Sequence, residues 1–188
     1  MAVVTGGASG IGLAIARKMA AEGAHLVIAD LNFGAAKLIA EELAGNAVEA
    51  DVSREPGVKA MVEAAVAARG RLDILVNNAG VGTEGKRLAD CDEDEWDRVV
   101  RIDLTSVFLC MKAALPALRA SGYGSIVNVA SVAAIVAWRG TAPYTAAKGG
   151  VAALTRATAA EYARLGVRVN CLCPGVTETP LMERATGG

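Results

Sequence analysis

Short apolar runs alternate with segments of helical periodicity along the chain, and this alternation limits the folds that it can adopt. The runs are brief, rich in β-branched residues and leucine, and apolar on both faces, as in parallel strands covered on both sides. The expected strands are residues 2–5, 25–30, 47–50, 72–77, 125–130 and 167–173. The expected helices are residues 10–22, 33–44, 56–69, 92–120 and 143–165. This order predicts an α/β fold: a doubly wound parallel sheet with helices on both faces.

The size and charge of the chain limit its number of domains and the kinds of partner that it can bind. It has 188 residues, 53% of them hydrophobic, which suits one packed domain over residues 1–188 better than two. The formal net charge of −1 and the lack of a basic run give no electrostatic support for a nucleic-acid or membrane partner. The sequence has neither a signal-peptide pattern nor an apolar run of about 20 residues. We therefore expect a cytoplasmic protein.

The cysteines and the single histidine do not suggest a metal or hydrolase site. No CxxC pair occurs among the cysteines, so we expect them to be buried and reduced, with no metal bound. His25 starts an apolar strand-like run and is expected to be structural. A Ser-His-Asp hydrolase would depend on this one histidine, which argues against that class. The cysteines are Cys91, Cys110, Cys171 and Cys173.

The fourth expected helix has recognisable ends. Its acidic start places negative charge where the helix dipole favours it, and this explains residues 90–97 better than a metal site does. Asp92 and Glu95 have the spacing of a capping box, and Gly122 suits the exit. Pro116 is expected to kink the helix near its end.

A glycine-rich turn, TGGASGIG at residues 5–12, joins the first strand to the first helix. Glycines permit a tight turn and a close approach of a pyrophosphate to the backbone, while the helix N-terminus offers free N–H groups. Between a strand and a helix, such a turn is a candidate nucleotide-binding loop. Its candidate contacts are Gly6, Ser9, Gly10, Ile11 and Gly12.

Asp30 indicates which dinucleotide this loop would hold. It ends the second strand, where a carboxylate can accept hydrogen bonds from both ribose hydroxyls of adenosine and would repel a 2′-phosphate. Neither Ser9 nor Leu31 supplies a compensating cation. The sequence therefore favours NAD(H) over NADP(H); the alternative is that Asp30 only caps the loop.

With these motifs the chain resembles the short-chain dehydrogenase/reductases in their single-domain form, over nearly its whole length. The resemblance rests on the glycine loop, on Asp51-Val52, on NNAG at 77–80, on Ser131 with YTAAK at 144–148, and on the Pro174-Gly175 segment. It implies that residues 1–188 form a Rossmann-type domain that binds NAD and carries the catalytic residues. It also implies a homotetramer or homodimer through helices 92–120 and 143–165. The cofactor contacts carried over are Leu31, Asp51, Val52, Asn78, Ala79, Gly80, Tyr144, Lys148, Pro174, Gly175, Thr177 and Thr179.

The YTAAK segment predicts acid/base chemistry. Tyr144 and Lys148 are four residues apart and share one helix face. An ammonium about 5 Å from a buried phenol favours the phenolate by roughly 3 kcal/mol at an effective dielectric of about 20. The phenol can then exchange a proton with the substrate oxygen. Ser131, just past the fifth strand, can stabilise charge on that oxygen. The expected reaction is hydride transfer between NAD(H) and a secondary alcohol or ketone.

The sequence departs from the family pattern at two places. Asp103 stands where the family usually has an asparagine that holds a water beside the active-site lysine. It is a candidate member of the catalytic set: either a tolerated swap, or the cause of an impaired or pH-shifted proton relay. Relatives also usually continue past the Pro174-Gly175 segment, so we expect a fold without the C-terminal helix and last strand.

Three further interpretations stay open. A 3-oxoacyl-carrier reductase would draw on NADPH, which Asp30 disfavours. A non-enzymatic NAD(H)-binding sensor or scaffold would fit the change at Asp103 but leaves the Ser131, Tyr144 and Lys148 set without a use. Finally, Trp138 and Arg139 either line a substrate pocket, where Arg139 could receive a carboxylate, or only pack a surface loop.

Overall fold

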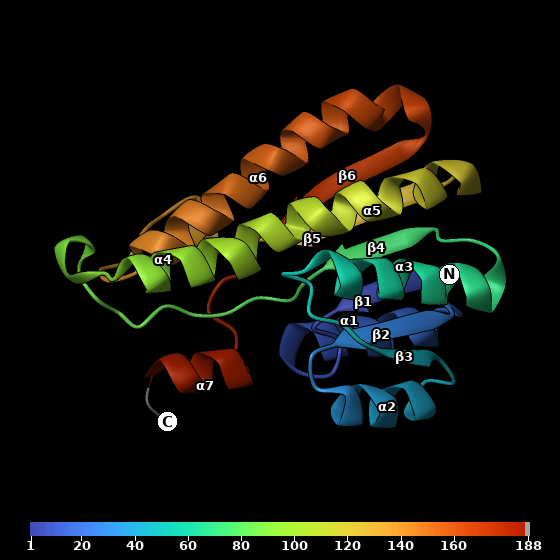
Figure 1. Cartoon of the computed structure of the whole chain (residues 1–188), viewed down its shortest axis with the longest axis horizontal. Coiled ribbons are helices and arrows are strands. Elements are labelled where there is room, and N and C mark those ends of the chain that lie inside the picture. Colours follow the sequence, from blue (N-terminus) through green and yellow to red (C-terminus); the bar gives the residue numbers. More distant parts are fainter. Residues whose placement is uncertain (187–188) are drawn as a thin grey trace.

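Parallel strands form one sheet in the order β3-β2-β1-β4-β5-β6 (Figure 1). The computed structural model describes residues 1–186 of the chain, and side chains as far as Glu183. The strand order reverses between β1 and β4, which makes the sheet doubly wound, as predicted. The strands are β1 Ala2–Thr5, β2 Leu26–Asp30, β3 Asn46–Glu49, β4 Ile74–Asn77, β5 Gly124–Val129 and β6 Val167–Leu172.

Helices cover both faces of this sheet. The first two pack on one face, while α3, α5 and α6 pack on the other. The main helices are α1 Gly10–Ala21, α2 Phe33–Glu42, α3 Glu55–Arg69, α4 Glu93–Val100, α5 Ser106–Ser121, α6 Ala142–Tyr162 and α7 Pro180–Thr186. Shorter helical turns are η1 Leu88–Asp90, η2 Arg101–Thr105, η3 Val132–Ala134 and η4 Ala163–Leu165.

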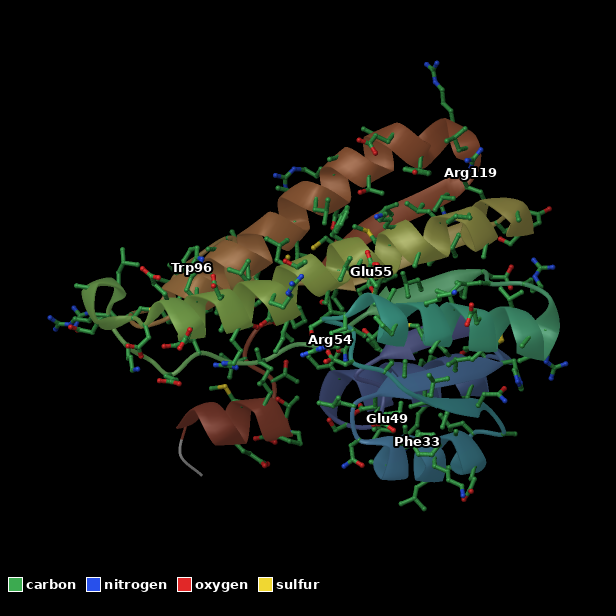
Figure 2. All side chains as sticks on the ribbon, viewed as in Figure 1. Phe33, Glu49, Arg54, Glu55, Trp96 and Arg119 are labelled. Atoms are coloured by element: carbon green, nitrogen blue, oxygen red, sulfur yellow. The ribbon has the colours of Figure 1, made fainter. Side chains whose placement is uncertain are left out.

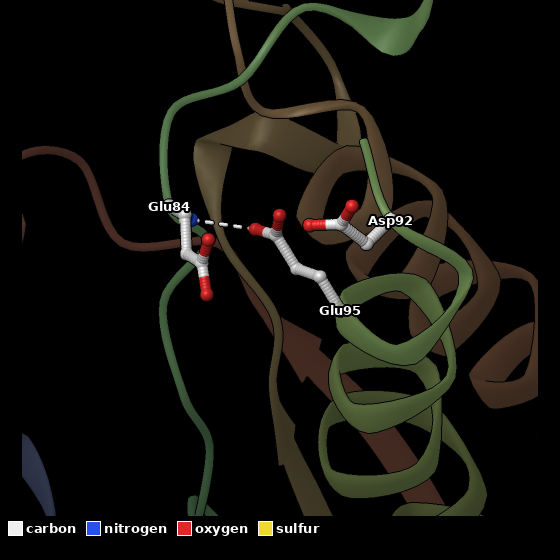
Figure 3. Close-up of side chains that lie close together, drawn as sticks. All are labelled: Glu84, Asp92 and Glu95. Atoms are coloured by element: carbon white, nitrogen blue, oxygen red, sulfur yellow. Dashed lines mark hydrogen bonds between the residues drawn. The ribbon is translucent and has the colours of Figure 1, made fainter. Parts of the chain in front are cut away.

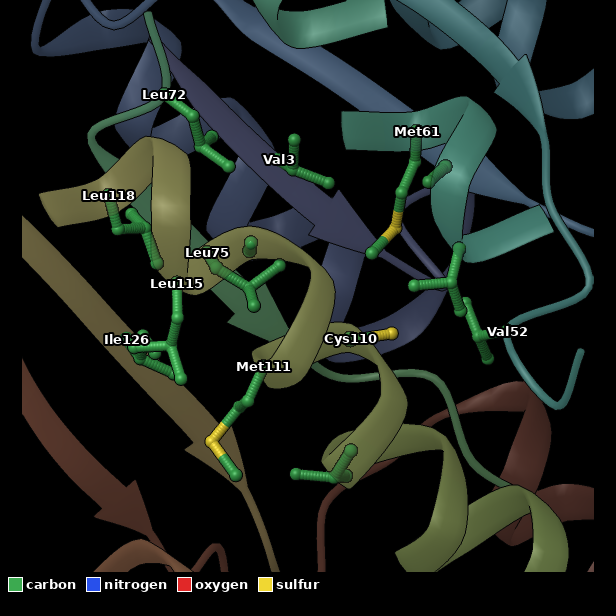
Figure 4. Close-up of a cluster of buried hydrophobic side chains, with 14 of the residues drawn as sticks. Val3, Val52, Met61, Leu72, Leu75, Cys110, Met111, Leu115, Leu118 and Ile126 are labelled. Atoms are coloured by element: carbon green, nitrogen blue, oxygen red, sulfur yellow. The ribbon is translucent and has the colours of Figure 1, made fainter. Parts of the chain in front are cut away.

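The strands bury both faces because alternate side chains point to opposite sides. In β1, Val3 joins the core under α3, α5 and α6, and Val4 joins the core under α1 and α2; both are fully buried. Figure 4 shows Val3 in the first core with Leu75 of β4, Met61 of α3 and Leu115 of α5. Apolar burial on both faces explains why these strands read as continuous hydrophobic runs.

The helix expected at 92–120 is a continuous run of α4, η2 and α5, and η2 is π-helical. A π turn adds a residue to a turn of helix and often marks a functional site. Here it contains Asp103, which is fully buried. Gly122 ends α5 in the left-handed conformation, with φ of 80°, as predicted. Pro116 lies inside α5, and its kink stays a prediction.

The predicted capping box of α4 is wrong. Asp92 occupies the N-cap position, but its side chain makes no capping hydrogen bond and pairs with Lys86 instead. The buried carboxylate of Glu95 accepts hydrogen bonds from the Thr83 hydroxyl at 2.5 Å and from the Glu84 N–H at 2.6 Å. The preceding loop offers these carboxylates an ammonium, a hydroxyl and an amide, so both bind the loop rather than the helix end.

The cysteines and the histidine lie as follows. All four cysteines are free, but only Cys110 is buried; Cys91, Cys171 and Cys173 are half-buried, which corrects the expectation for these three. Burial raises the pKa of Cys110 to about 12. His25 precedes β2, away from the carboxyl ends of the strands, where it contacts Asn46 and Arg69. Among the described residues, no helix is long and apolar enough to cross a membrane.

Candidate active site

The glycine loop follows β1 and leads into α1, and it has the shape expected of an anion-binding turn. Gly6 and Gly10 have φ of 60° and 52°, backbone conformations that residues other than glycine rarely adopt. A Cβ on Gly12 would lie 2.2 Å from the Gly6 carbonyl oxygen, so this glycine is required for packing of the loop on its own helix. Ser9 is the extended N-cap residue and makes no side-chain cap, so N–H groups of the first turn stay available to a ligand.

Asn78 joins this loop to the next strand of the sheet. Its side-chain amide donates to the carbonyls of Thr5 and Gly6, at 3.0 and 3.1 Å. Its own N–H and that of Ala79 bind the Thr5 hydroxyl. The NNAG segment therefore holds the end of β4 against the glycine turn, across the switch point where such sheets bind ligands.

A cleft of about 390 Å³ opens at this switch point. Most of the candidate cofactor contacts line it: Gly6, Ser9, Gly10, Ile11, Asp30, Leu31, Asp51, Val52, Asn78, Ala79, Gly80, Tyr144, Lys148 and Thr179. Gly12, Pro174, Gly175 and Thr177 do not. Gly12 is buried against the Gly6 carbonyl, and the Pro174 carbonyl accepts from the Val132 N–H at 2.8 Å.

Several lining residues escaped the sequence analysis, and one of them carried a signal. The cleft is also lined by Ala50, Val81, Ile102, Val129, Ala130, Pro180 and Leu181. Thr179 followed by Pro180 is a typical helix start, and the Thr179 hydroxyl accepts from the Met182 N–H at 3.2 Å. This short helix, α7, begins over the glycine turn: a Cβ on Gly10 would lie 3.3 Å from the methyl group of Thr179.

Two carboxylates stand on the side of the cleft nearest β2 and β3. Asp30 accepts from the Ala8 N–H at 3.1 Å and from the Asn32 N–H at 3.0 Å, which ties the end of β2 to the glycine loop. Asp51 accepts from the hydroxyl and N–H of Ser53, and the hydroxyl is the main reason that the pKa of Asp51 is lowered. Both carboxylates are therefore held in place where they line the cleft.

Tyr144 and Lys148 lie in the first turns of α6, on the face that lines the cleft. The Lys148 ammonium lies 5.5 Å from the centre of the Tyr144 ring. It donates to the Val129 carbonyl at 3.4 Å, and its side chain is 5% exposed. The low exposure of Lys148 limits the screening of its charge by solvent, so buried charges next to it matter for the phenol.

Asp103 forms an ion pair with Lys148, with 3.0 Å between Oδ1 and Nζ. Both carboxylate oxygens also accept from the Val81 N–H at 3.2 Å. A Cβ on Gly80 would lie 2.5 Å from Asp103 Oδ1 and 3.3 Å from Lys148 Nζ, so only glycine leaves room for the pair. Burial raises the pKa of Asp103, while Lys148 and the Val81 N–H oppose that rise. Asp103 thus contacts directly the lysine beside which the family resemblance placed it, and its effect on the proton relay stays a prediction.

Ser131 lies just past β5, where it is the N-cap of η3. Its hydroxyl oxygen accepts from the Ala133 N–H at 3.1 Å, which leaves the hydroxyl proton free to be donated elsewhere. Its neighbours Val129 and Ala130 line the cleft. A strand-exit serine in this position can therefore act as a hydrogen-bond donor beside the cleft.

Trp138 and Arg139 line a different cavity. Its volume is about 620 Å³, and its lining includes Arg87, the N-cap residue Thr141 and Thr145 of α6. This cavity and the cleft share no lining residue. Among the described residues, nothing places Arg139 beside the tyrosine.

Three carboxylates gather where the loop after β4 meets α4 (Figure 3): Glu84, Asp92 and Glu95, with oxygens within 4.8 Å of one another. The Lys86 ammonium binds both Glu84, at 2.9 Å, and Asp92. These two contacts raise the pKa of Lys86, Asp92 contributing most. The charge of this cluster is thus offset by a lysine of the same loop, and the cluster holds the loop on the helix.

The comparisons with known proteins agree with this geometry. A family model described as short chain dehydrogenase matches residues 1–187. The chain is 46% identical over 187 residues to cis-4-hydroxycyclohexanecarboxylate dehydrogenase of Sinomonas cyclohexanicum, covering 97% of this chain and 75% of that protein. The chain belongs to the short-chain dehydrogenase family.

Two further similarities extend this finding. This short-chain dehydrogenase is 43% identical to 4-formylbenzenesulfonate dehydrogenase TsaC1/TsaC2 of Comamonas testosteroni, covering 100% of this chain and 76% of the relative. It also resembles the crystal structure of a 3-ketoacyl-(acyl-carrier-protein) reductase from Brucella melitensis complexed with NADH, with a TM-score of 0.93 and 38% identity, covering 96% and 77% of the two chains. The chain is thus an alcohol oxidoreductase of this family, whose cofactor is a nicotinamide dinucleotide.

Proposed function

We propose that this short-chain dehydrogenase transfers a hydride between NAD(H) and a secondary alcohol or ketone, with Tyr144 as the acid/base. One observation carries the proposal: Tyr144 and Lys148 line the same cleft as the glycine turn and Asp30. A dinucleotide held by the turn would therefore end beside the phenol. The resemblance to the family motifs assigns the same roles to these residues.

The cleft fits such a cofactor by its chemistry. Gly6 and Gly10 at the start of α1 would hold the pyrophosphate, and Asn78 to Gly80 would border the central part. Asp30 would accept from the ribose hydroxyls of adenosine, since its carboxylate lines the cleft next to the exposed Leu31. A 2′-phosphate at this place would meet the carboxylate, and this supports NAD(H) over NADP(H).

The chain's own residues would handle the proton. In alcohol oxidation, Tyr144 Oη takes the hydroxyl proton of the substrate, and in ketone reduction it returns a proton to the carbonyl oxygen. Lys148 stands 5.5 Å from the centre of the Tyr144 ring, and the hydroxyl proton of Ser131 would stabilise negative charge on the substrate oxygen. NAD⁺, when bound, would accept the hydride that leaves the carbinol carbon of the substrate.

The relatives suggest a substrate class for the first assays. Cis-4-hydroxycyclohexanecarboxylate dehydrogenase is named for a six-membered-ring secondary alcohol. We therefore propose cyclic secondary alcohols as substrates. The test is NADH-coupled turnover over cyclohexanol, both 4-hydroxycyclohexanecarboxylates and a 3-oxoacyl thioester, beside an NADH binding titration. Turnover of cyclic alcohols with NAD⁺ is expected. Preferential turnover of the thioester with NADPH would contradict the proposal, as would NADH binding without turnover of any substrate, which would favour a sensor.

We further propose that the enzyme is a homotetramer or homodimer that associates through α4, α5 and α6. Trp96 of α4 is 39% exposed and Phe108 of α5 is 46% exposed (Figure 2 labels Trp96). The small residues Ala153 and Ala157 are exposed on α6 and would allow close helix packing. Light scattering on the purified protein should give a multiple of the 19.1 kDa chain mass, and Ala153→Glu should lower it. A monomer at micromolar concentration would contradict this proposal.

The cytoplasmic location expected from the sequence stays a prediction.

A further inference from the structure

We propose that Asp103 is the built-in counter-ion of Lys148, so that the pair carries no net charge and largely cancels the help that Lys148 gives to the tyrosinate of Tyr144. This inference rests on the proposed function of Tyr144. Its geometric basis is the buried contact of 3.0 Å between Asp103 Oδ1 and Lys148 Nζ, where Asp103 has no exposed surface and Lys148 has almost none.

Three features of the fold fix the position of the Asp103 carboxylate. The π-helical turn η2 turns Asp103 inward, Gly80 leaves the space that its Oδ1 occupies, and the Val81 N–H donates to both of its oxygens. Two donors, an amide and an ammonium, therefore face the carboxylate. Asp103 contacts Lys148, so it acts on Tyr144 through that lysine and is a positioning residue rather than a catalytic one.

The pair is neutral wherever its shared proton resides. With the proton on Lys148, an ammonium faces a carboxylate. If the proton moves to Asp103, a neutral acid faces a neutral amine. Among the described residues that contact the carboxyl group, Lys148 Nζ is then the atom that can accept a hydrogen bond from it. In both arrangements the charges of Asp103 and Lys148 sum to zero, and Tyr144 meets a dipole instead of a lone cation.

Among the described residues, Arg98 of α4 is a further charged group that acts on Asp103. It acts on Asp103 through space, while its own guanidinium is exposed and donates to the Gly82 carbonyl at 3.3 Å. Solvent screens an exposed cation far more than a buried one. From α6 the titratable groups are Tyr144 and Lys148 themselves. The buried carboxylate is thus the group that decides the net charge behind the phenol.

Two consequences follow for the enzyme. Without the help of an uncompensated lysine, alcohol oxidation should need a higher pH than it would with an asparagine at position 103. The buried carboxylate should also favour the cationic ring of NAD⁺ over the neutral ring of NADH. A residue that only supports the fold would change neither the pH dependence nor this ratio.

The experiment uses Asp103→Asn, which keeps the size and the acceptor for the Val81 N–H but removes the charge. We expect the pH midpoint of kcat for alcohol oxidation to move by roughly one unit toward lower pH. The ratio of the Kd values of NAD⁺ and NADH, measured by binding titration without substrate, should rise roughly tenfold. Asp103→Ala should shift both in the same direction. Glu93→Gln, an exposed carboxylate on the preceding helix, is the control and should shift neither.

The outcomes separate this inference from the proposed function. Wild-type turnover that depends on Tyr144, with an unchanged pH midpoint and Kd ratio in folded Asp103→Asn, would overturn the inference alone. If neither variant folds, ¹³C NMR of the Asp103 carboxyl and ¹⁵N NMR of Lys148 in the unmodified protein decide. A protonated Asp103 beside a charged Lys148 would overturn the inference. Charges of Asp103 and Lys148 that sum to zero over the working pH range would support it.

Discussion

The carboxylate of Asp103 lies 3.0 Å from the ammonium of Lys148, and both groups are enclosed between the π-helical turn η2 and helix α6. Breaking a buried pair by removing one partner typically costs 3–5 kcal/mol, because the other charge is left uncompensated. The surroundings of the pair are therefore expected to be as sensitive to substitution as the pair itself.

Gly80→Ala tests the space beside the pair. The new Cβ would lie 2.5 Å from Asp103 Oδ1, so the carboxylate or the backbone must move. We expect a loss of stability of about 1–3 kcal/mol from overpacking, and a fall in kcat of at least about tenfold because Lys148 shifts with its partner. Gly149→Ala, one residue past Lys148 with no atom near its added Cβ, is the matched control and should be neutral or slightly stabilising. Equal behaviour of the two variants would contradict the packing described for Gly80.

Asp30→Ala tests the choice of cofactor. Removal of the carboxylate takes away the acceptors for the ribose hydroxyls and the charge that opposes a 2′-phosphate. Steady-state kcat/KM should fall by roughly tenfold or more for NAD⁺ and should rise for NADP⁺. The control is Glu49→Ala, which removes an exposed carboxylate of β3 that is labelled in Figure 2. Glu49 is the register partner of Asp30 and is not among the residues that line the cleft. An unchanged preference in Asp30→Ala would show that this acid only caps the loop.

Glu95→Gln tests how the loop before α4 is held. The Glu84 N–H, more than the Thr83 hydroxyl, holds the pKa of Glu95 below its usual value. A lowered folded pKa gives stability that is complete above the unfolded value of about 4.3 and is lost as pH falls through the folded value. We expect the variant to lose about 1–3 kcal/mol at neutral pH and to lose less stability than the wild type on acidification below about pH 4.3. Urea unfolding at several pH values measures this.

The control for this prediction is Glu93→Gln, which also removes a carboxylate from the first turn of α4. Glu93 is exposed, so its removal should cost less than about 0.5 kcal/mol and should leave the acid limb of the stability curve nearly unchanged. If Glu95→Gln unfolds with the same pH profile as the wild type, the hydrogen bonds of Glu95 to the loop do not contribute as described.

The sheet could be predicted from the sequence because its causes are local. Short apolar runs covered on both faces have few alternatives to buried parallel strands, and the glycine turn after β1 fixes the switch point. The facing of Tyr144 and Lys148 also followed from their spacing on one helix. What escaped depended on neighbours distant in sequence. The π turn around Asp103 has no local sequence signal. Glu95 does not cap its own helix because its carboxylate accepts hydrogen bonds from the loop at Thr83.

The pocket residues illustrate the same limit. Trp138 and Arg139 lie between Ser131 and Tyr144 in sequence, yet their cavity shares no lining residue with the cleft. By contrast, the start of α7 at Thr179 and Pro180 carried a readable helix signal that the sequence analysis did not use. Sequence spacing predicted what shares an element, and the structure was needed to show which elements enclose a common space.

Replacement of Tyr144 by phenylalanine tests the central claim most directly. The measurement is kcat for NAD⁺-dependent oxidation of a cyclic secondary alcohol by Tyr144→Phe, beside an NADH binding titration, with Tyr123→Phe as control because that tyrosine is 84% exposed. We expect a loss of at least about 10²-fold in kcat, unchanged NADH affinity, and a control that matches the wild type. Turnover by Tyr144→Phe within a few-fold of the wild type would contradict the role of Tyr144 as the acid/base.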